Sequence, residues 1–238
     1  MRSPRVDAML DAIFAHAARN DEYWDDLSVL AKEAAGSSIV RPFVVARCRR
    51  SLACADAATI VRVIDVLLEV KEPVARLAVP FARHAEEAVR CTVACALEDS
   101  RDPGAIAALA SLCCDSQPSV RRAAITAMVR GLGVPGEHDF VDTPVVRDAL
   151  AACLDDESEP SRDQVILGLA MRRDRRALAP LAALLAGDEL TANLVDAAYY
   201  LAAPELRDAL VRHALAGSSV SGEWSLEDAV AACTVDLR

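Results

Sequence analysis

Gly131, Gly133 and Gly136 have the spacing G-x-G-x-x-G, a pattern that in some folds holds the pyrophosphate of a dinucleotide. That chemistry requires the glycines to follow a strand and to open a helix, so that backbone N–H groups face the phosphates. Here they follow a helical pattern, they enclose Pro135, and an acidic stretch comes next. The sequence therefore predicts a glycine helix stop and a surface loop, with no cofactor site.

The same insertion, residues 131–143, carries Glu137, His138, Asp139 and Phe140, which combine titratable groups with an aromatic ring. Inserted loops on rigid scaffolds often carry recognition. The alternative is that Phe140 only covers an apolar groove. A catalytic role would need a nucleophile and oxyanion donors at known distances, which no spacing here supplies. Glu137, His138 and Phe140 are therefore candidate partner-binding residues, and no catalytic residue is assigned.

Arginines recur on the second members of the predicted helix pairs. If these second helices line one face, their arginines would form a basic stripe suited to an acidic protein segment or, with less support, to phosphates. The alternative is pairing with acidic side chains of the turns, although surface pairs contribute only about 0–1 kcal/mol each. The candidate partner-binding arginines are Arg76, Arg83, Arg147, Arg207 and Arg212.

The cysteines and histidines do not have the spacing of a metal site. The sequence contains eight Cys and four His but no C-x-x-C pair, and Cys91 and Cys95 stand four residues apart in one helical pattern. We interpret the cysteines as small buried hydrophobic residues in a reducing cytosol. No metal site is predicted.

Composition favours helices. Of the 238 residues, 53% are hydrophobic but only 4% aromatic, and the apolar mass is Ala, Leu and Val. Ala and Leu are the best helix formers, whereas strand-rich proteins rely on aromatic and β-branched residues. The net charge of −10 and the pI of about 4.9 count against a nucleic-acid partner, which usually requires a basic footprint.

The helical pattern repeats. Glu87–Arg122 reads as helix, turn, helix and restart, and Val89 is followed by Val120 after 31 residues. Such a period indicates a stacked array of supersecondary units. The 131–143 insertion interrupts it once. The expected helices, about 14, cover residues 4–19, 24–35, 39–52, 56–70, 73–84, 87–98, 103–114, 118–131, 144–154, 160–172, 175–186, 190–202, 204–216 and 224–235.

Two segments carry a family resemblance: VRCTVACAL…DPGAIAALASLCCD and VILGLAMRRDRRALAPLAALLAGD. They resemble HEAT repeats, specifically the short, phycobilisome-lyase-like type. The resemblance implies an all-α, right-handed α-α superhelix, a HEAT-type solenoid that binds proteins along its second-helix face. It is strongest over 56–216. Residues 1–55 are expected to be divergent helices that cap the array, and 217–238 a C-terminal capping helix.

The expected function is a cytoplasmic, non-catalytic scaffold that binds another protein. An immunity-type or regulatory protein that inhibits one dedicated protein is the first alternative. A HEAT-like-repeat DNA glycosylase or a bilin lyase is the second, although no motif supports either enzyme. The N-terminal apolar run is interrupted by Asp7 and Asp11, so it predicts an amphipathic helix and no signal peptide. No apolar run approaches the length of a membrane span.

Overall fold

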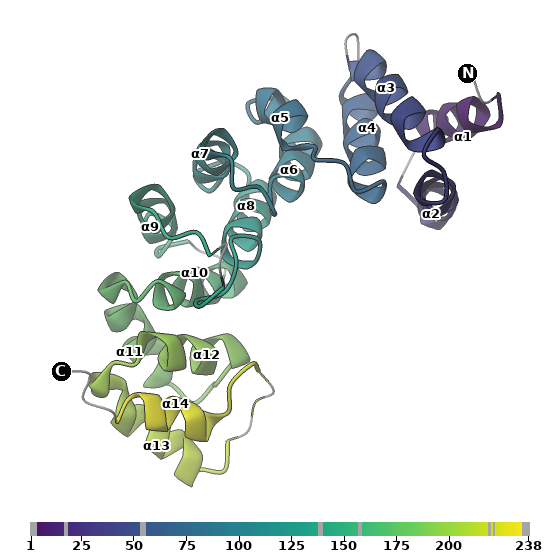
Figure 1. The fold of residues 1–238 in the computed structure, drawn as a ribbon. Helices are drawn as coiled ribbons and strands as arrows, with labels where there is room; N and C mark the ends of the chain where they lie inside the picture. Colours follow the sequence, from purple (N-terminus) through teal and green to yellow (C-terminus); the bar gives the residue numbers. More distant parts are fainter. Residues whose placement is uncertain are drawn as a thin grey trace. The chain divides into compact units, whose positions relative to one another are not determined.

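The computed structural model describes residues 4–16, 19–52, 56–137, 140–156, 159–218, 220 and 222–234, and its secondary structure is entirely helical (Figure 1). This confirms the all-α fold and the fourteen predicted helices. No helix in these ranges combines the length and apolar character needed to cross a bilayer. The α-helices are α1 Pro4–Ala15, α2 Asp21–Ala35, α3 Val40–Leu52, α4 Ala57–Glu69, α5 Ala75–Ala78, α6 Glu87–Ala96, α7 Pro103–Leu112, α8 Pro118–Arg130, α9 Pro144–Ala151, α10 Glu159–Met171, α11 Leu178–Leu185, α12 Ala192–Leu201, α13 Arg207–Leu215 and α14 Leu226–Ala232.

The chain divides into two compact units, Met1–Leu97 and Glu98–Arg238. The boundary lies between α6 and α7, inside the predicted repeat region 56–216. The expected division into an N-terminal cap, repeats and a C-terminal capping helix stays a prediction.

In the first unit, α4 is the central helix. Every residue from Ile60 to Leu67 is buried, so this helix has no exposed side over two turns. It packs against α1, α2, α3 and α6. Because the buried run includes Arg62 and Asp65, the neighbouring elements must supply polar partners for both.

In the second unit, successive helices form two rows. One row is α8, α10, α12 and α14, each packed against the next, and α7 packs on α9 as α11 does on α13 in the other row (Figure 1). Gly168 lets α10 approach α8 closely, because a Cβ at this position would lie 2.7 Å from Cγ2 of Val129. The regular packing of sequential helices agrees with the predicted repeat.

Several second helices contain 3-10 turns where the sequence predicted continuous α-helix. The predicted helix 73–84 is the short α5 followed by η1 (Val79–Phe81), because Pro80 has no N–H to donate to the carbonyl of Arg76. The helices predicted at 175–186 and 204–216 begin as η2 (Arg175–Ala177) and η3 (Pro204–Leu206).

Helix starts follow the expected chemistry. Pro103, Pro118 and Pro144 each occupy the first position of a helix, where a missing N–H costs nothing. Asp102 accepts a hydrogen bond from the Gly104 N–H as N-cap of α7. Asp174 does the same for η2, and Thr191 caps α12 by accepting from the Leu194 N–H.

Candidate functional site

The insertion after α8 is a closed loop at the C-terminus of a helix. Gly133 and Gly136 have φ values of 84° and 96°, in the left-handed region that favours glycine. The Val141 N–H donates to the carbonyl of Leu132 at 2.8 Å, so the chain returns to the point where it left α8. The predicted helix stop and surface loop are confirmed. Because a helix and no strand precedes the glycines, the arrangement is not that of a dinucleotide site.

Gly131 serves a different purpose. Its φ is ordinary, but a Cβ here would lie 1.9 Å from the carbonyl oxygen of Glu98. Arg101 donates a hydrogen bond to the Gly131 carbonyl, which holds the segment of Glu98 and Arg101 against the end of α8. The end of α8 therefore requires glycine for close backbone approach.

Two of the three candidate loop residues lie in the described part of the chain. The exposed Glu137 accepts a hydrogen bond through Oε2 from the Val134 N–H at 3.0 Å, which closes the turn. The half-buried Phe140 ring lies over the guanidinium of Arg172, with 5.0 Å between Cζ and the ring centroid. The ring thus covers a cation, whereas the sequence analysis expected Phe140 either to bind a partner or to cover an apolar groove. His138 lies outside the described residues.

Arg172 is the residue at this site that the sequence analysis missed. Its side chain is only 2% exposed. Nη1 donates to the carbonyl of Gly168 at 2.8 Å, and Nε and Nη2 donate to the carbonyl of Val141 at 3.2 and 3.0 Å. Burial lowers the pKa of this guanidinium to about 10. The signal was available, since residue 172 continues the i, i+4, i+7 spacing of the buried Val165 and Leu169.

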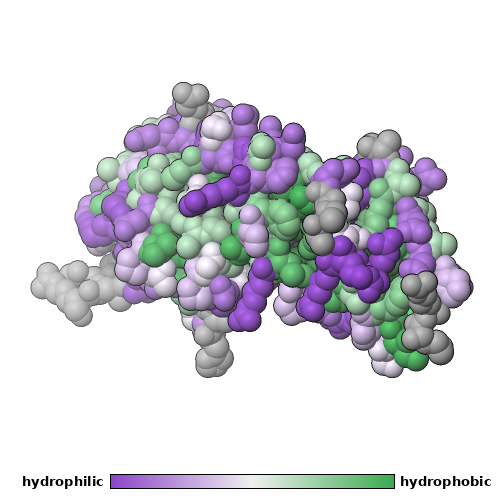
Figure 2. Space-filling view, turned by 90° about the horizontal axis from the view of Figure 1, so that it is seen from above, coloured by the Kyte–Doolittle hydropathy of each residue, from purple (hydrophilic) through white to green (hydrophobic). Residues whose placement is uncertain are grey.

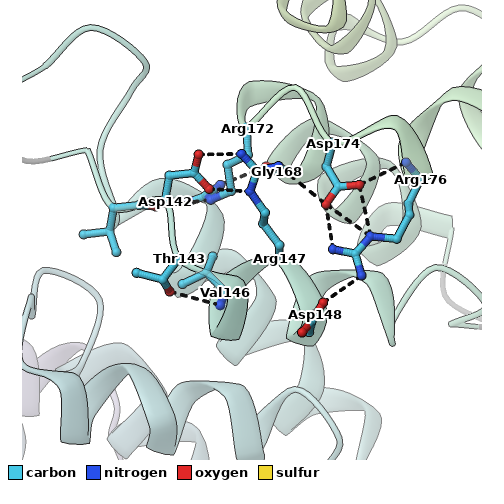
Figure 3. A network of polar contacts seen from close by, with 10 residues as sticks. Asp142, Thr143, Val146, Arg147, Asp148, Gly168, Arg172, Asp174 and Arg176 are labelled. Carbon is cyan, nitrogen blue, oxygen red and sulfur yellow. Dashed lines mark hydrogen bonds and ion pairs between the residues drawn. The ribbon is translucent and has the colours of Figure 1, made fainter.

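Beside Arg172, a chain of ion pairs connects the loop, α9 and η2 (Figure 3). Arg147 holds Asp142 through two hydrogen bonds of 2.6 Å, and Arg176 bridges Asp174 at 2.6 Å and Asp148 at 2.8 Å. These hydrogen bonds hold the pKa of Asp142 and of Asp174 below the usual range. The candidate Arg147 is therefore already neutralised by Asp142, as the pairing alternative for the arginines expected.

The other candidate arginines belong to two different units. Arg76 and Arg83 are exposed in the first unit, and neither forms an ion pair with a described residue. Arg207 and Arg212 are both exposed on α13 of the second unit. The sequences of α7 and α11 contain no charged residue, so the second-helix row of this unit carries its cations on α9, η2 and α13. Whether these arginines bind a partner stays a prediction.

A second polar cluster, in the first unit, also escaped the sequence analysis. Asp65 on α4 is 4% exposed and accepts hydrogen bonds from the Tyr23 hydroxyl at 2.8 Å and from Arg19 at 2.9 Å. Burial raises the pKa of both Asp65 and Tyr23. Arg62 donates to the carbonyl of His16. The available signal was the pair of charges inside the apolar run IVRVID.

Of the eight cysteines predicted to be buried, four are buried, two are exposed and Cys91 is half-buried, while Cys54 lies outside the described residues. Cys48, Cys113, Cys153 and Cys233 are buried. Cys95 is exposed because it lies on the outer side of α6, and Cys114 is exposed because it follows the end of α7. Within the described ranges, His, Cys, Asp and Glu form no group of three or more that could hold a metal ion.

Comparisons with known proteins agree with this architecture. The model for HEAT repeats matches residues 74–137, which include α5 to α8. The X-ray structure of YibA from Escherichia coli superposes with a TM-score of 0.62 at 19% sequence identity, over 98% of this chain and 97% of that chain. At this identity the likeness shows the fold alone. No curated protein matches the sequence.

The match confirms the resemblance to HEAT repeats for the first of the two segments, which lies within residues 74–137. The narrower phycobilisome-lyase-like type stays a prediction. The repeat model and the superposed structure point to the same all-helical repeat architecture. Residues 74–137 therefore match HEAT repeats, and the chain as a whole has the fold of a helical-repeat protein.

Proposed function

We propose that this protein is a non-catalytic, cytoplasmic scaffold that binds a partner protein, and that α13 forms part of the binding surface. HEAT repeats typically mediate protein binding. The observation that carries the proposal is an exposed apolar anchor beside two cations. Leu215 is 84% exposed, Arg212 stands one helical turn before it, and Arg207 is exposed on the same helix. Figure 2 shows hydrophobic surface between hydrophilic residues on the face that it views.

The contacts of α13 leave these side chains available to a partner. Nη2 of Arg212 donates to the carbonyl of Leu185 at 2.5 Å, which fixes the guanidinium while the side chain remains exposed. Arg207 lies 3.6 Å from the carboxylate of its neighbour Asp208, which is itself almost fully exposed. Such an exposed pair contributes little to stability. A partner carboxylate can therefore compete for Arg207 at small cost.

The chemistry of α13 defines the partner surface. Burying an exposed leucine contributes about 1.5–3 kcal/mol, and arginine is enriched among residues that dominate binding energy. The expected partner offers an apolar pocket for Leu215 with carboxylates near Arg207 and Arg212. The positive charge here contrasts with the net charge of −10 of the whole chain, so it favours one orientation of an acidic partner.

A non-catalytic role is supported by the way the clustered charges are used. In the second unit, Asp142 and Asp174 are each bound by an arginine, and in the first unit Asp65 is bound by Arg19. Charges committed to one another in this manner hold elements together and are not poised for proton transfer. The buried thiols are consistent with a reducing compartment.

The test is affinity capture with the tagged full-length chain, followed by quantitative mass spectrometry. The variant Arg207→Glu/Arg212→Glu should recover the partner at least about tenfold less well than wild type, because two contacts become repulsive. The matched control is Arg122→Glu/Arg173→Glu, which makes the same charge change at exposed positions of the second unit. Equal recovery by both variants contradicts a role for α13. One dedicated partner, rather than several, would favour the regulatory or immunity-type form of the proposal.

A further inference from the structure

Three cysteines line a cavity of about 510 Å³ in the second unit. Cys113 and Cys114 directly follow α7, and Cys153 follows α9. The other walls include Arg121 at the start of α8 and Asp156, which are joined by an ion pair of 2.7 Å. The cavity therefore brings thiols from two successive second helices to one place that small molecules can enter.

The Cys153 thiol lies against the backbone of Cys113, and both residues line the cavity. They are 1% and 4% exposed and come from positions 40 residues apart in the chain. Sγ of Cys153 donates to the carbonyl of Cys113 at 3.4 Å and to that of Ala149 at 3.3 Å. The neighbouring Cys114 is exposed.

We propose that Cys113 and Cys153 form a site of reversible oxidation, at which a hydroperoxide that enters the cavity converts the two thiols into an intramolecular disulfide. The inference is independent of the proposed partner binding. It assigns a chemical property to residues that sequence analysis interpreted only as core packing.

The reaction with hydrogen peroxide balances in two steps. The Cys153 thiolate attacks one peroxide oxygen, an S–O bond forms, the O–O bond breaks, and the departing hydroxide takes up the proton released by Cys153. The sulfur of Cys113 then attacks the sulfenic acid, the S–S bond forms, and the S–O bond breaks. The leaving hydroxide takes up the Cys113 proton and departs as a second water. Overall, two thiols lose two electrons and one peroxide is reduced to two waters.

The surroundings favour Cys153 as the first nucleophile. Interaction with Cys113 lowers the pKa of Cys153, with help from the charge of Arg121 and against the opposing effects of burial and of Asp156. Interaction with Cys153 and burial raise the pKa of Cys113. Since the thiolate is the reactive form, Cys153 reacts first and Cys113 resolves the sulfenic acid.

The disulfide would join the end of α7 to the end of α9 and enclose α8 and the 131–143 insertion. Closing a loop of this length restricts the unfolded chain and stabilises the folded one. The oxidised protein should therefore melt several degrees above the reduced protein.

The test is peptide mapping of the reduced full-length protein before and after hydrogen peroxide. Trypsin cleaves after Arg101, Arg121, Arg147 and Arg162, so a disulfide would link peptides 102–121 and 148–162 with the loss of two hydrogens. The link should disappear in Cys113→Ala and Cys153→Ala and persist in Cys114→Ala. It should also revert with dithiothreitol. Cys48 and Cys233 are buried, and neither contacts another thiol among the described residues, so they serve as internal controls that should stay reduced.

Two results would overturn the proposal, and both come from folded protein. In wild type, peroxide would leave peptides 102–121 and 148–162 unlinked while oxidising only Cys114. Alternatively, Cys114→Ala would abolish the link, which would assign the bond to Cys114. Because the wild-type map decides the first point, the proposal remains testable even if an alanine variant fails to fold.

Discussion

At the scale of single residues, two buried charges are satisfied by different chemistry. Arg172 is held by the carbonyls of Val141 and Gly168 and by the ring of Phe140, with no carboxylate within ion-pair distance among the described residues. Asp65 is held by a hydroxyl and a guanidinium. In both cases burial opposes the charged form, so the partners must supply the stabilisation that water would otherwise give.

Replacing Arg172 with Met should lower the free energy of unfolding by about 2–4 kcal/mol, because the carbonyls of Val141 and Gly168 lose their guanidinium donor. Urea unfolding monitored by circular dichroism measures the change. The control is Arg173→Met, an exposed neighbour whose replacement should cost no more than about 0.5 kcal/mol. Equal midpoints for the two variants would show that Arg172 does not hold the insertion.

Replacing Asp65 with Asn should alter the pH dependence of stability. Burial raises the folded-state pKa of Asp65 above the ordinary 3.8, so the folded form binds more protons between the two pKa values. Stability from this group is present at low pH and lost as pH rises through the folded pKa. The Asn variant does not ionise at this position, so its stability relative to wild type should rise as the pH increases from 3.8 through the folded-state pKa of Asp65.

Thermal melts at several pH values check this prediction, with the exposed Asp25→Asn as control. A constant difference between wild type and Asp65→Asn across the range would mean that the pKa of Asp65 is not raised by folding.

At this scale the sequence carries a signal for the unusual residues, although the sequence analysis missed Arg172 and Asp65, but it carries none for their partners. The helical spacing of apolar residues places position 172 on the inner side of α10. Nothing in the neighbouring sequence shows that Val141, 31 residues away, supplies the carbonyl that accepts the hydrogen bonds of Arg172. Arg147 shows the same limit. As a candidate partner-binding residue it was expected to be exposed, but it is half-buried and bound by Asp142 of the preceding loop. The conformation of that loop does not follow from helical periodicity.

At the scale of helices, the inward faces follow from periodicity and the ends follow from capping chemistry. Asp102 and Pro103 fix the start of α7, and Leu109 lies on its inner side with 0% exposure. The observed helices differ from the predicted ones where proline or the tertiary structure shortens a helix, as Pro80 does after α5. Helical patterns therefore predicted each element, while the 3-10 turns depended on local hydrogen bonding.

Leu109→Arg should lower the free energy of unfolding of the second unit by about 4 kcal/mol or more, since a charge would replace a fully buried apolar group without a partner. Chemical denaturation with purified protein measures it. Ala107→Arg on the exposed side of the same helix should change stability by no more than about 0.5 kcal/mol. Cooperative unfolding of Leu109→Arg at the wild-type midpoint would contradict the assigned inner face of α7.

At the scale of the whole molecule, the repeat period predicted the HEAT architecture because each helix pair buries its apolar edges only against its neighbours. The same pattern could not locate the division between Leu97 and Glu98, since the boundary lies between two helices that the period treats as one pair. Nor could it show that α13 combines Arg207, Arg212 and an exposed Leu215, because exposure depends on which helices cover it.

Protein binding through α13 is the central claim. It is tested most directly by hydrogen–deuterium exchange of the full-length chain, alone and with the partner recovered by affinity capture. We expect slower exchange in α13 and in the turn that follows it, with a smaller effect in Arg207→Glu/Arg212→Glu at the same partner concentration. Protection confined to other helices, with α13 unchanged in the wild-type complex, would contradict the account.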